Sequence, residues 1–485
     1  MRSPRIAIIG AGFAGIAAAL RLRSDGHTNI AVFEASADVG GTWLHNTYPG
    51  AACDAPSHIY SYSFAQRTQW SRRFAPGPEI LSYLHRCAAD GGIAEMIHTN
   101  ARVITARWTG TQWLLEFADG ATHTADILVP ALGQLNVPAI PPITGLDRFA
   151  GKHFHTARWR HDIDLTGLRV TVVGTGASAI QVIPEIAPRV GHLTVVQRSA
   201  PYVLRKFDTT YTERLHRLYR SLPLLRSAAR QMIWGYLELV TVGFTRWPHA
   251  LAVLQRYHDR ILRTQIADPA LRRKLRPDYP IGCKRILMSN DYYAALTRPN
   301  VTVLSESLTG VTEFGVTTTS GHHHADVIIL ATGFTSTPLF SGIEIVGCDG
   351  TRLQQVWAER ERAYLGLSVP RFPNMFLMYG PNTNLGSGSI VYMLEAQVAH
   401  IVAAANVIRA QHNRALEITD RAFHAFGEEL DAAQPRTVWS GCSSWYHDAA
   451  GRDTHNWPWT MSQYRRRTRR INRADYELLD ISSPT

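Results

Sequence analysis

The chain has 485 residues, of which 45% are hydrophobic and 18% are charged. This composition supports buried cores and excludes a chain that is disordered throughout. Fifty Lys and Arg residues against 39 Asp and Glu residues give a formal net charge of +11. Six arginines lie within residues 465–473. We interpret them as a solvated surface or an attraction for an anionic cofactor, in preference to a nucleic-acid arm.

A strand–helix–strand pattern opens the chain. It consists of a short β-branched strand over residues 5–9, an Ala-rich helix to about residue 23 and a second strand over residues 30–33. The turn after the first strand reads Gly10-x-Gly12-x-x-Gly15, and Glu34 ends the second strand. Gly10 permits a tight turn, Gly12 lets the backbone approach a pyrophosphate, and Gly15 lets the helix pack on the strand. Because Glu34 can accept hydrogen bonds from a ribose diol, the pattern predicts a dinucleotide site for a cofactor without a 2′-phosphate.

The same pattern recurs after a Pro-rich linker, with strands over residues 169–173 and 193–196. Between them stands Gly174-x-Gly176-x-x-Ala179, with Ser178 in the same turn. Arg198 occupies the position of the acid, and a guanidinium binds a phosphate that a carboxylate would repel. We therefore expect NADPH rather than NADH at this second site, with Ser199 as a further phosphate contact.

Two dinucleotide sites in one chain indicate that electrons pass from a nicotinamide to a flavin. Two further buried strands, within residues 126–133 and 326–334, end in small-residue turns. They look like the crossings between two nucleotide domains of such flavoproteins. Thr332 and Gly333, in the second of these turns, are candidate cofactor contacts.

Five cysteines stand far apart in the sequence: Cys53, Cys87, Cys283, Cys348 and Cys442. They form no CxxC pair, no metal-finger spacing and no paired framework, which favours a reducing cytoplasm and argues against a flavin disulfide reductase. The consecutive histidines 322–324 are expected in an exposed hairpin turn, pointing in different directions, so no metal site is predicted. The apolar stretch 232–244 has 13 residues, too few to span a bilayer, and we expect no stable membrane insertion.

Residues 40–54 and 149–159 resemble two fingerprints of the type I Baeyer–Villiger monooxygenases, within the flavin-containing monooxygenase superfamily. The first fingerprint is matched by Gly40, Gly41, Trp43, Tyr48, Pro49, Gly50 and Asp54. The second is matched by Phe149, Gly151, His155 and Trp159. Arg160 departs from the family, which usually has Pro or Asp there. Trp159 favours the Baeyer–Villiger branch, because heteroatom-oxidising relatives commonly carry Tyr or Phe at this position.

A third block, residues 279–296, resembles the Lys-Arg site of the same family. The resemblance implies that Lys284 contacts the phosphate end of NADPH and that Arg285 lies over the flavin. A fixed guanidinium would stabilise the peroxide anion and the anionic adduct with the ketone. Asp54 would orient Arg285, and His155 would have a gating or positioning role. Further cofactor contacts are expected at Gly41, Thr42, Trp43, Asp54 and Tyr60.

The predicted fold is α/β, with two Rossmann-type domains that bind FAD and NADPH. The FAD domain is expected to be discontinuous, and residues 206–275, apolar at helical spacing and broken by Pro223, are expected to form a helical insertion in the NADPH domain. The expected segments are 1–145 and 336–485 for the FAD domain, and 146–205 and 276–335 for the NADPH domain.

The resemblance implies an NADPH- and O2-dependent flavoprotein that converts a small ketone to an ester or lactone through a flavin C4a-peroxide. The nearest alternative is N- or S-oxygenation by the protonated flavin hydroperoxide, which needs less anion stabilisation. A non-catalytic redox sensor is a third reading, which the retention of the flavin-proximal motifs disfavours. The oligomeric state and the particular ketone are not encoded in any motif that we identify.

Overall fold

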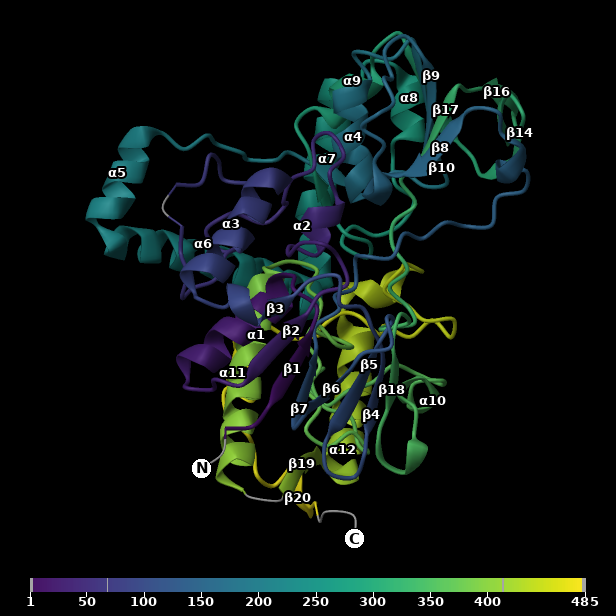
Figure 1. Ribbon diagram of the computed structural model, residues 1–485. Coiled ribbons are helices and arrows are strands. Elements are labelled where there is room, and N and C mark those ends of the chain that lie inside the picture. Colours follow the sequence, from purple (N-terminus) through teal and green to yellow (C-terminus); the bar gives the residue numbers. More distant parts are fainter. Residues whose placement is uncertain (1–2, 68, 412–413, 482–485) are drawn as a thin grey trace.

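The computed structural model describes residues 3–67, 69–411 and 414–481. Two separate parallel sheets organise the chain. Figure 1 places β1, β2 and β7 in the lower half of the molecule and β8, β9, β10 and β17 in the upper half. The predicted α/β fold with two dinucleotide-binding units is confirmed.

The lower sheet has the strand order β3-β2-β1-β7. Its strands are β1 (Ile6–Ile9), β2 (Ile30–Phe33), β3 (Ile97–His98) and β7 (Ile127–Pro130). Ile6 of β1 stands opposite both Ile30 and Ile127, and all of β1 and β7 is buried. Strands without polar alternation are expected where helices or other layers cover both faces of a parallel sheet.

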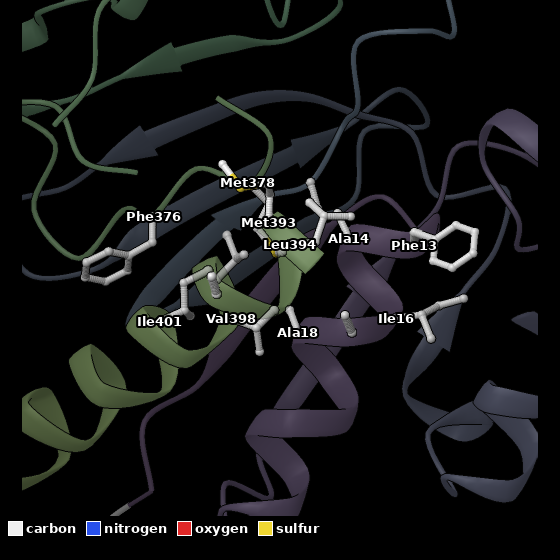
Figure 2. Close-up of a cluster of buried hydrophobic side chains, with 14 of the residues drawn as sticks. Phe13, Ala14, Ile16, Ala18, Phe376, Met378, Met393, Leu394, Val398 and Ile401 are labelled. Atoms are coloured by element: carbon white, nitrogen blue, oxygen red, sulfur yellow. The ribbon is translucent and has the colours of Figure 1, made fainter. Parts of the chain in front are cut away.

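Two helices from distant parts of the sequence pack together beside this sheet: α1 (Phe13–Ser24) and α11 (Ile390–Ala410). Figure 2 shows the small side chains of Ala14 and Ala18 facing the α11 side chains Leu394 and Val398. By length and composition α11 resembles a membrane-spanning helix, but 56% of its apolar window is buried in the protein. It is a core helix, and it joins the C-terminal part of the chain to the first domain.

The upper sheet has the strand order β13-β10-β9-β17-β8, and all of its strand pairs are parallel. Its strands are β8 (Lys152–His155), β9 (Arg169–Val173), β10 (His192–Gln197), β13 (Val301–Ser305) and β17 (Val327–Leu330). Helices α4 (Ala177–Ile186) and α9 (Tyr292–Leu296) cover it and contribute to a second apolar core. The sheet therefore takes strands from both sides of the predicted insertion.

The predicted insertion is helical. It contains α5 (Glu213–Ser221), α6 (Pro223–Thr245), α7 (Ala252–Gln265) and α8 (Pro269–Lys274), and the short strand β11 (Val203–Leu204) lies just before it. Pro223 separates α5 from α6 and is the first residue of α6, a position where the missing N–H costs nothing. In Figure 1, α5 and the adjoining end of α6 stand out to one side of the molecule.

Smaller elements complete the two halves. They are α2 (Thr42–His45), α3 (Gly77–Asp90), β4 (Val103–Trp108), β5 (Trp113–Phe117), β6 (Thr122–Ala125), β12 (Leu287–Met288), β14 (Leu308–Thr312), β15 (Gly315–Thr318), β16 (Gly321–His324), β18 (Glu344–Val346), α10 (Leu353–Val356), β19 (Arg414–Ile418), α12 (Asp420–Ala433), α13 (Met461–Thr468) and β20 (Tyr476–Asp480). The three histidines expected in a turn instead form most of β16, which pairs with β15.

The expectation of unpaired cysteines is wrong. Cys283 and Cys442, 159 positions apart, form a disulfide, while Cys53, Cys87 and Cys348 are free. Their neighbours Ile281 and Val438 belong to one small apolar cluster, so packing rather than sequence spacing brings the two sulfurs together. The pairing also removes the argument for a reducing compartment that rested on cysteine spacing.

Candidate active site

Asp54 and Arg285 form a two-pronged ion pair. Nη2 of Arg285 donates to Oδ1 and Oδ2 of Asp54 at 2.8 and 2.7 Å, and Nε donates to Oδ2 at 3.0 Å. The charge of Asp54 raises the pKa of Arg285 above its usual range. Burial by itself would raise the pKa of Asp54, but the charge and hydrogen bonds of Arg285 outweigh burial and lower it. Both groups are therefore charged at neutral pH, and the guanidinium is fixed in direction.

Different parts of the chain supply the two partners. Asp54 lies in the loop between α2 and α3, and Arg285 lies just before β12. Strand β12 pairs with β11, which anchors the Arg285 segment to the upper half of the molecule. Cys53, the neighbour of Asp54, belongs to the core of the lower half. The ion pair thus joins the two halves.

The 40–54 fingerprint crosses from one dinucleotide unit to the other. At its start, a Cβ on Gly41 would lie 3.1 Å from Cα of Gly12. Further along, the Tyr48 hydroxyl donates to Oε1 of Gln181 in α4, and Nε2 of Gln181 donates to the Ala52 carbonyl, both at 2.9 Å. Tyr48 is packed in the core of the upper half. The fingerprint therefore positions Asp54 relative to both sheets.

The first glycine motif has no room for side chains at two positions. Gly10 has φ +105°, and a Cβ there would lie 2.6 Å from the Ala131 carbonyl oxygen. A Cβ on Gly15 would lie 1.8 Å from the Gly10 carbonyl oxygen. The carboxylate of Glu34, at the end of β2, accepts the Ala11 and Ser36 N–H groups at 2.8 Å each. Each of its oxygens keeps a second lone pair for a ribose hydroxyl.

The second glycine motif opens into free space. Gly174 has φ +110° and packs against Ala331, whereas a Cβ on Gly176 would meet no described atom within 4 Å. No side chain in the described part of the chain caps α4, or α1 at Gly12. Uncapped helix N-termini behind glycines suit the phosphates of dinucleotides. Both motifs therefore fit the cofactors that the sequence predicts.

Positive groups gather at the end of β10, beside the second motif. Nζ of Lys284 lies 3.4 Å from the Ser199 hydroxyl and over the ring of Tyr279 at 4.4 Å. Burial lowers the pKa of Lys284, and the charge of Arg198 lowers it further. Arg198 itself is exposed. Two cations that repel each other beside a hydroxyl form a site that a phosphate would neutralise.

The remaining expected cofactor contacts lie in α2, in α4 and in the loops near the two glycine motifs. Thr42 donates to the Leu135 carbonyl at 3.4 Å, and Trp43 Nε1 donates to the Tyr60 hydroxyl at 3.1 Å. Thr332 donates to the Ala139 carbonyl at 2.5 Å, and Gly333 has φ +84°. Ser178 and Ala179 lie at the start of α4, where Ala179 is buried.

His155 and Trp159 flank a short turn after β8. Nδ1 of His155 accepts the Ala157 N–H at 3.1 Å, and its ring packs edge-on to Phe334. Burial lowers the pKa of His155, so the ring is neutral at neutral pH. Trp159 is half-buried and packs edge-on to Phe154 at 5.1 Å. The contacts of His155 with the segment after β17 agree better with positioning than with proton transfer.

Three residues near the ion pair escaped the sequence analysis. Burial raises the pKa of Tyr446, and it raises the pKa of Tyr379 to about 12. At both tyrosines the positive charge of Arg285 opposes this rise. Among the described residues, the hydroxyl of the fully buried Tyr446 has no hydrogen-bond partner. Lys206, just after β11, is close enough to Asp54 for that carboxylate to affect its pKa, which burial lowers. None of the three stands in a motif, so no local signal identifies them.

Two family models match the chain. The pyridine nucleotide-disulphide oxidoreductase model matches residues 4–222, and the flavin-binding monooxygenase-like model matches residues 118–347. Together they cover both glycine motifs and the Lys284–Arg285 segment.

Individual relatives cover nearly the whole chain. A Baeyer–Villiger monooxygenase of Streptomyces coelicolor is 41% identical over 98% of this chain and 92% of its own length. One of Pseudomonas aeruginosa is 42% identical with the same coverage. The solved structure of an oxidized steroid monooxygenase bound to NADP has a TM-score of 0.88 and 31% identity, covering 99% of this chain and 100% of that chain. A complex of OTEMO with FAD and NADP has a TM-score of 0.87 and 27% identity, with the same coverage. With identity at this level from end to end, the chain belongs to the Baeyer–Villiger monooxygenase family.

Proposed function

We propose that this chain uses FAD, NADPH and O2 to insert one oxygen atom next to the carbonyl of a small ketone, producing an ester or lactone. The observation that carries the proposal is the ion pair between Asp54 and Arg285, which fixes a guanidinium where the two dinucleotide units meet. The bound flavin, once reduced by NADPH, supplies the activation of dioxygen. The roles below belong to the residues of this chain.

We assign FAD to the lower half of the molecule. Gly10, Gly12 and Gly15 would carry its pyrophosphate at the start of α1, and Glu34 would accept from its ribose. Gly41, Thr42, Trp43 and Tyr60 would line the same cofactor.

We assign NADPH to the upper half. Gly174, Gly176, Ser178 and Ala179 would hold its pyrophosphate at the start of α4. Arg198, Ser199 and Lys284 would bind the 2′-phosphate end, since their charges and hydroxyl already lie together. Thr332 and Gly333 would contact the cofactor where the chain crosses back toward the lower half.

Arg285 would act on the charge that develops during oxygen insertion. When a ketone carbonyl is attacked, negative charge accumulates on its oxygen, and a preorganised cation stabilises that charge without having to reorient. Asp54 would hold the fork of Arg285 in place. The neutral His155 would position the chain between the two halves, and Trp159 would shape the same region.

N- or S-oxygenation is the less favoured alternative. Transfer of oxygen to an amine or thioether requires less stabilisation of an anion, and the named relatives are Baeyer–Villiger enzymes. The guanidinium of Arg285, which Asp54 holds in place, would stabilise the anion that forms when a ketone carbonyl is attacked.

The test compares products from one purified, FAD-loaded sample. We expect NADPH oxidation that depends on an added ketone, and an ester or lactone that carries one atom from isotopically labelled dioxygen. A panel of amines and thioethers serves as the comparison. Rapid formation of N-oxides or sulfoxides with no ester from any ketone would overturn the proposal.

A further inference from the structure

We propose that the outer side of the helical insertion is a docking surface for an anionic lipid bilayer, on which the protein rests without inserting a spanning helix. We call this surface the outer face. It is defined by exposed apolar residues of α6, of the turn after it and of α7: Leu225, Met232, Tyr236, Leu239, Trp247 and Val253. The inference is independent of the oxygenation chemistry.

The exposed apolar side chains are concentrated in this part of the molecule. Among the described residues, ten of the seventeen large exposed apolar side chains belong to residues 206–275, a small fraction of the chain. Met232, Tyr236 and Leu239 are 71%, 67% and 69% exposed, and Trp247 is 65% exposed. A concentration of large exposed apolar side chains in one segment is typical of an interaction surface on a protein.

Helix α6 carries apolar side chains on two sides: Trp234 and Leu237 pack against the core of the lower half, and a second apolar stripe is exposed. At about 100° per residue, Leu225, Met232, Tyr236 and Leu239 fall within roughly 60° of one another around the helix axis. The opposite side faces the protein, where Arg230 pairs with Glu395 at 3.4 Å and Thr241 donates to the Ser387 carbonyl at 3.2 Å. Packing against the protein therefore uses only one side of α6, and the second apolar stripe points to solvent.

The positive charge of the helical insertion indicates which kind of partner binds the outer face. Residues 206–275 contain 13 Lys and Arg residues and five Asp and Glu residues, so they carry +8 of the net charge of +11. Arg217 precedes the apolar stripe, and Arg246 and Arg256 follow it, all three exposed. A cationic surface with apolar side chains, including Trp and Tyr, is the composition that binds the interface of an anionic membrane.

A second copy of the chain fits this face less well. A symmetric dimer places the same patch of each subunit against the other, so the exposed Arg217, Arg246 and Arg256 of both subunits would be brought together. Like charges brought together in this way oppose association. An anionic bilayer neutralises the same charge and accepts the apolar groups.

The experiment is vesicle co-sedimentation of the FAD-loaded protein. One set of vesicles contains phosphatidylcholine only, and in the other phosphatidylglycerol replaces part of it. We expect binding to the anionic vesicles, weaker binding as salt concentration rises, and little binding to the neutral ones. Equal binding to both sets, or binding to neither, would overturn the proposal.

Matched variants localise the contact. The double substitution Met232→Ser and Leu239→Ser should reduce vesicle affinity at least about tenfold, and Arg217→Gln with Arg246→Gln should reduce it by about fivefold per arginine. The controls remove comparable groups elsewhere, Phe314→Ser with Ile104→Ser and Arg107→Gln with Arg189→Gln, all exposed. FAD content and turnover of a water-soluble ketone should stay unchanged in every variant.

Sedimentation velocity without lipid tests the competing occupant. We expect the wild-type protein and the Met232→Ser, Leu239→Ser variant to have the same oligomeric state. A wild-type dimer that the variant dissociates, with vesicle binding equal for variant and controls, would assign the outer face to a protein partner and overturn the proposal.

Discussion

Asp54 and Arg285, 231 positions apart in the chain, face each other through three N–O contacts of 2.7 to 3.0 Å. This pair gives Arg285 a defined direction at the junction of the two dinucleotide units. A guanidinium held in this way can stabilise negative charge at one place, which is what oxygen insertion beside a carbonyl requires.

Replacing Arg285 should separate oxygen insertion from the steps before it. Arg285→Ala should retain FAD and reduction by NADPH, while ester formation falls on the order of 100-fold. Hydrogen peroxide should appear in place of the ester. Arg285→Lys should recover only part of the loss, because an ammonium lacks the planar fork. The measurement follows NADPH, peroxide and ester on one sample, and ester formation by Arg285→Ala at near wild-type rates would contradict the assigned role.

The two glycine motifs should respond differently to a side chain. A Cβ at Gly12 would lie 3.6 Å from Cα of Gly41, and a Cβ at Gly176 would have no described atom within 4 Å, so neither position is closed to the first atom of a side chain. Gly12→Val should lose the flavin and its yellow colour, because the side chain would occupy the approach of a pyrophosphate. Gly176→Val should stay yellow and lose reduction by NADPH. Normal flavin content in Gly12→Val would show that the assignment of the two sites is exchanged.

Arg198 should determine the preference for NADPH. Removing a charge-assisted contact to the 2′-phosphate should raise KM for NADPH by about 10- to 100-fold in Arg198→Ala, with KM for NADH nearly unchanged. Arg189, an exposed arginine that follows the far end of α4, provides the matched control as Arg189→Ala. Equal kcat/KM values for the two nucleotides in the wild-type enzyme would refute the prediction.

Glu361 should make stability depend on pH. Its side chain is 4% exposed, and burial raises its pKa to about 7 from the ordinary 4.5. Because the folded state holds the proton more tightly than the unfolded state, the free energy of unfolding should fall as pH rises from about 4.5 to about 7, by on the order of 3 kcal/mol.

Thermal unfolding over this pH range measures the effect. Glu361→Gln should flatten the fall in Tm, because an amide does not titrate. Glu359→Gln, which changes an exposed glutamate two positions away, should follow the wild-type curve. Identical curves for all three proteins would show that Glu361 does not take up the proton.

Because of the disulfide, we expect only part of the five cysteines to react with a thiol reagent. In denaturant without reductant, only Cys53, Cys87 and Cys348 should react with a thiol reagent, and all five cysteines should react after reduction. Cys442→Ser should lower the free energy of unfolding by about 2–4 kcal/mol, since it removes a crosslink across a long loop. Cys348→Ser is the control. Five reactive thiols before reduction would contradict the pairing.

Local patterns predicted a large part of this fold. The strands expected at residues 30–33 and 169–173 coincide with β2 and β9, and Pro223 separates two helices as expected. These features depend on side-chain chemistry within a few residues: β-branched runs, glycines with positive φ and a proline without an N–H. The conformation at Gly10 and Gly174 is of the same kind, because a turn with φ above +100° excludes other side chains.

Contacts between distant segments were decided only by the tertiary structure. The resemblance to a family suggested that Asp54 orients Arg285, but no spacing along the chain indicates their distance or the two-pronged geometry. The link from Tyr48 to Gln181 joins residues 133 positions apart, and the disulfide joins residues 159 positions apart. Such contacts depend on the path of all the intervening chain and on how the two cores pack. No local sequence pattern therefore identifies the residues that become neighbours in space.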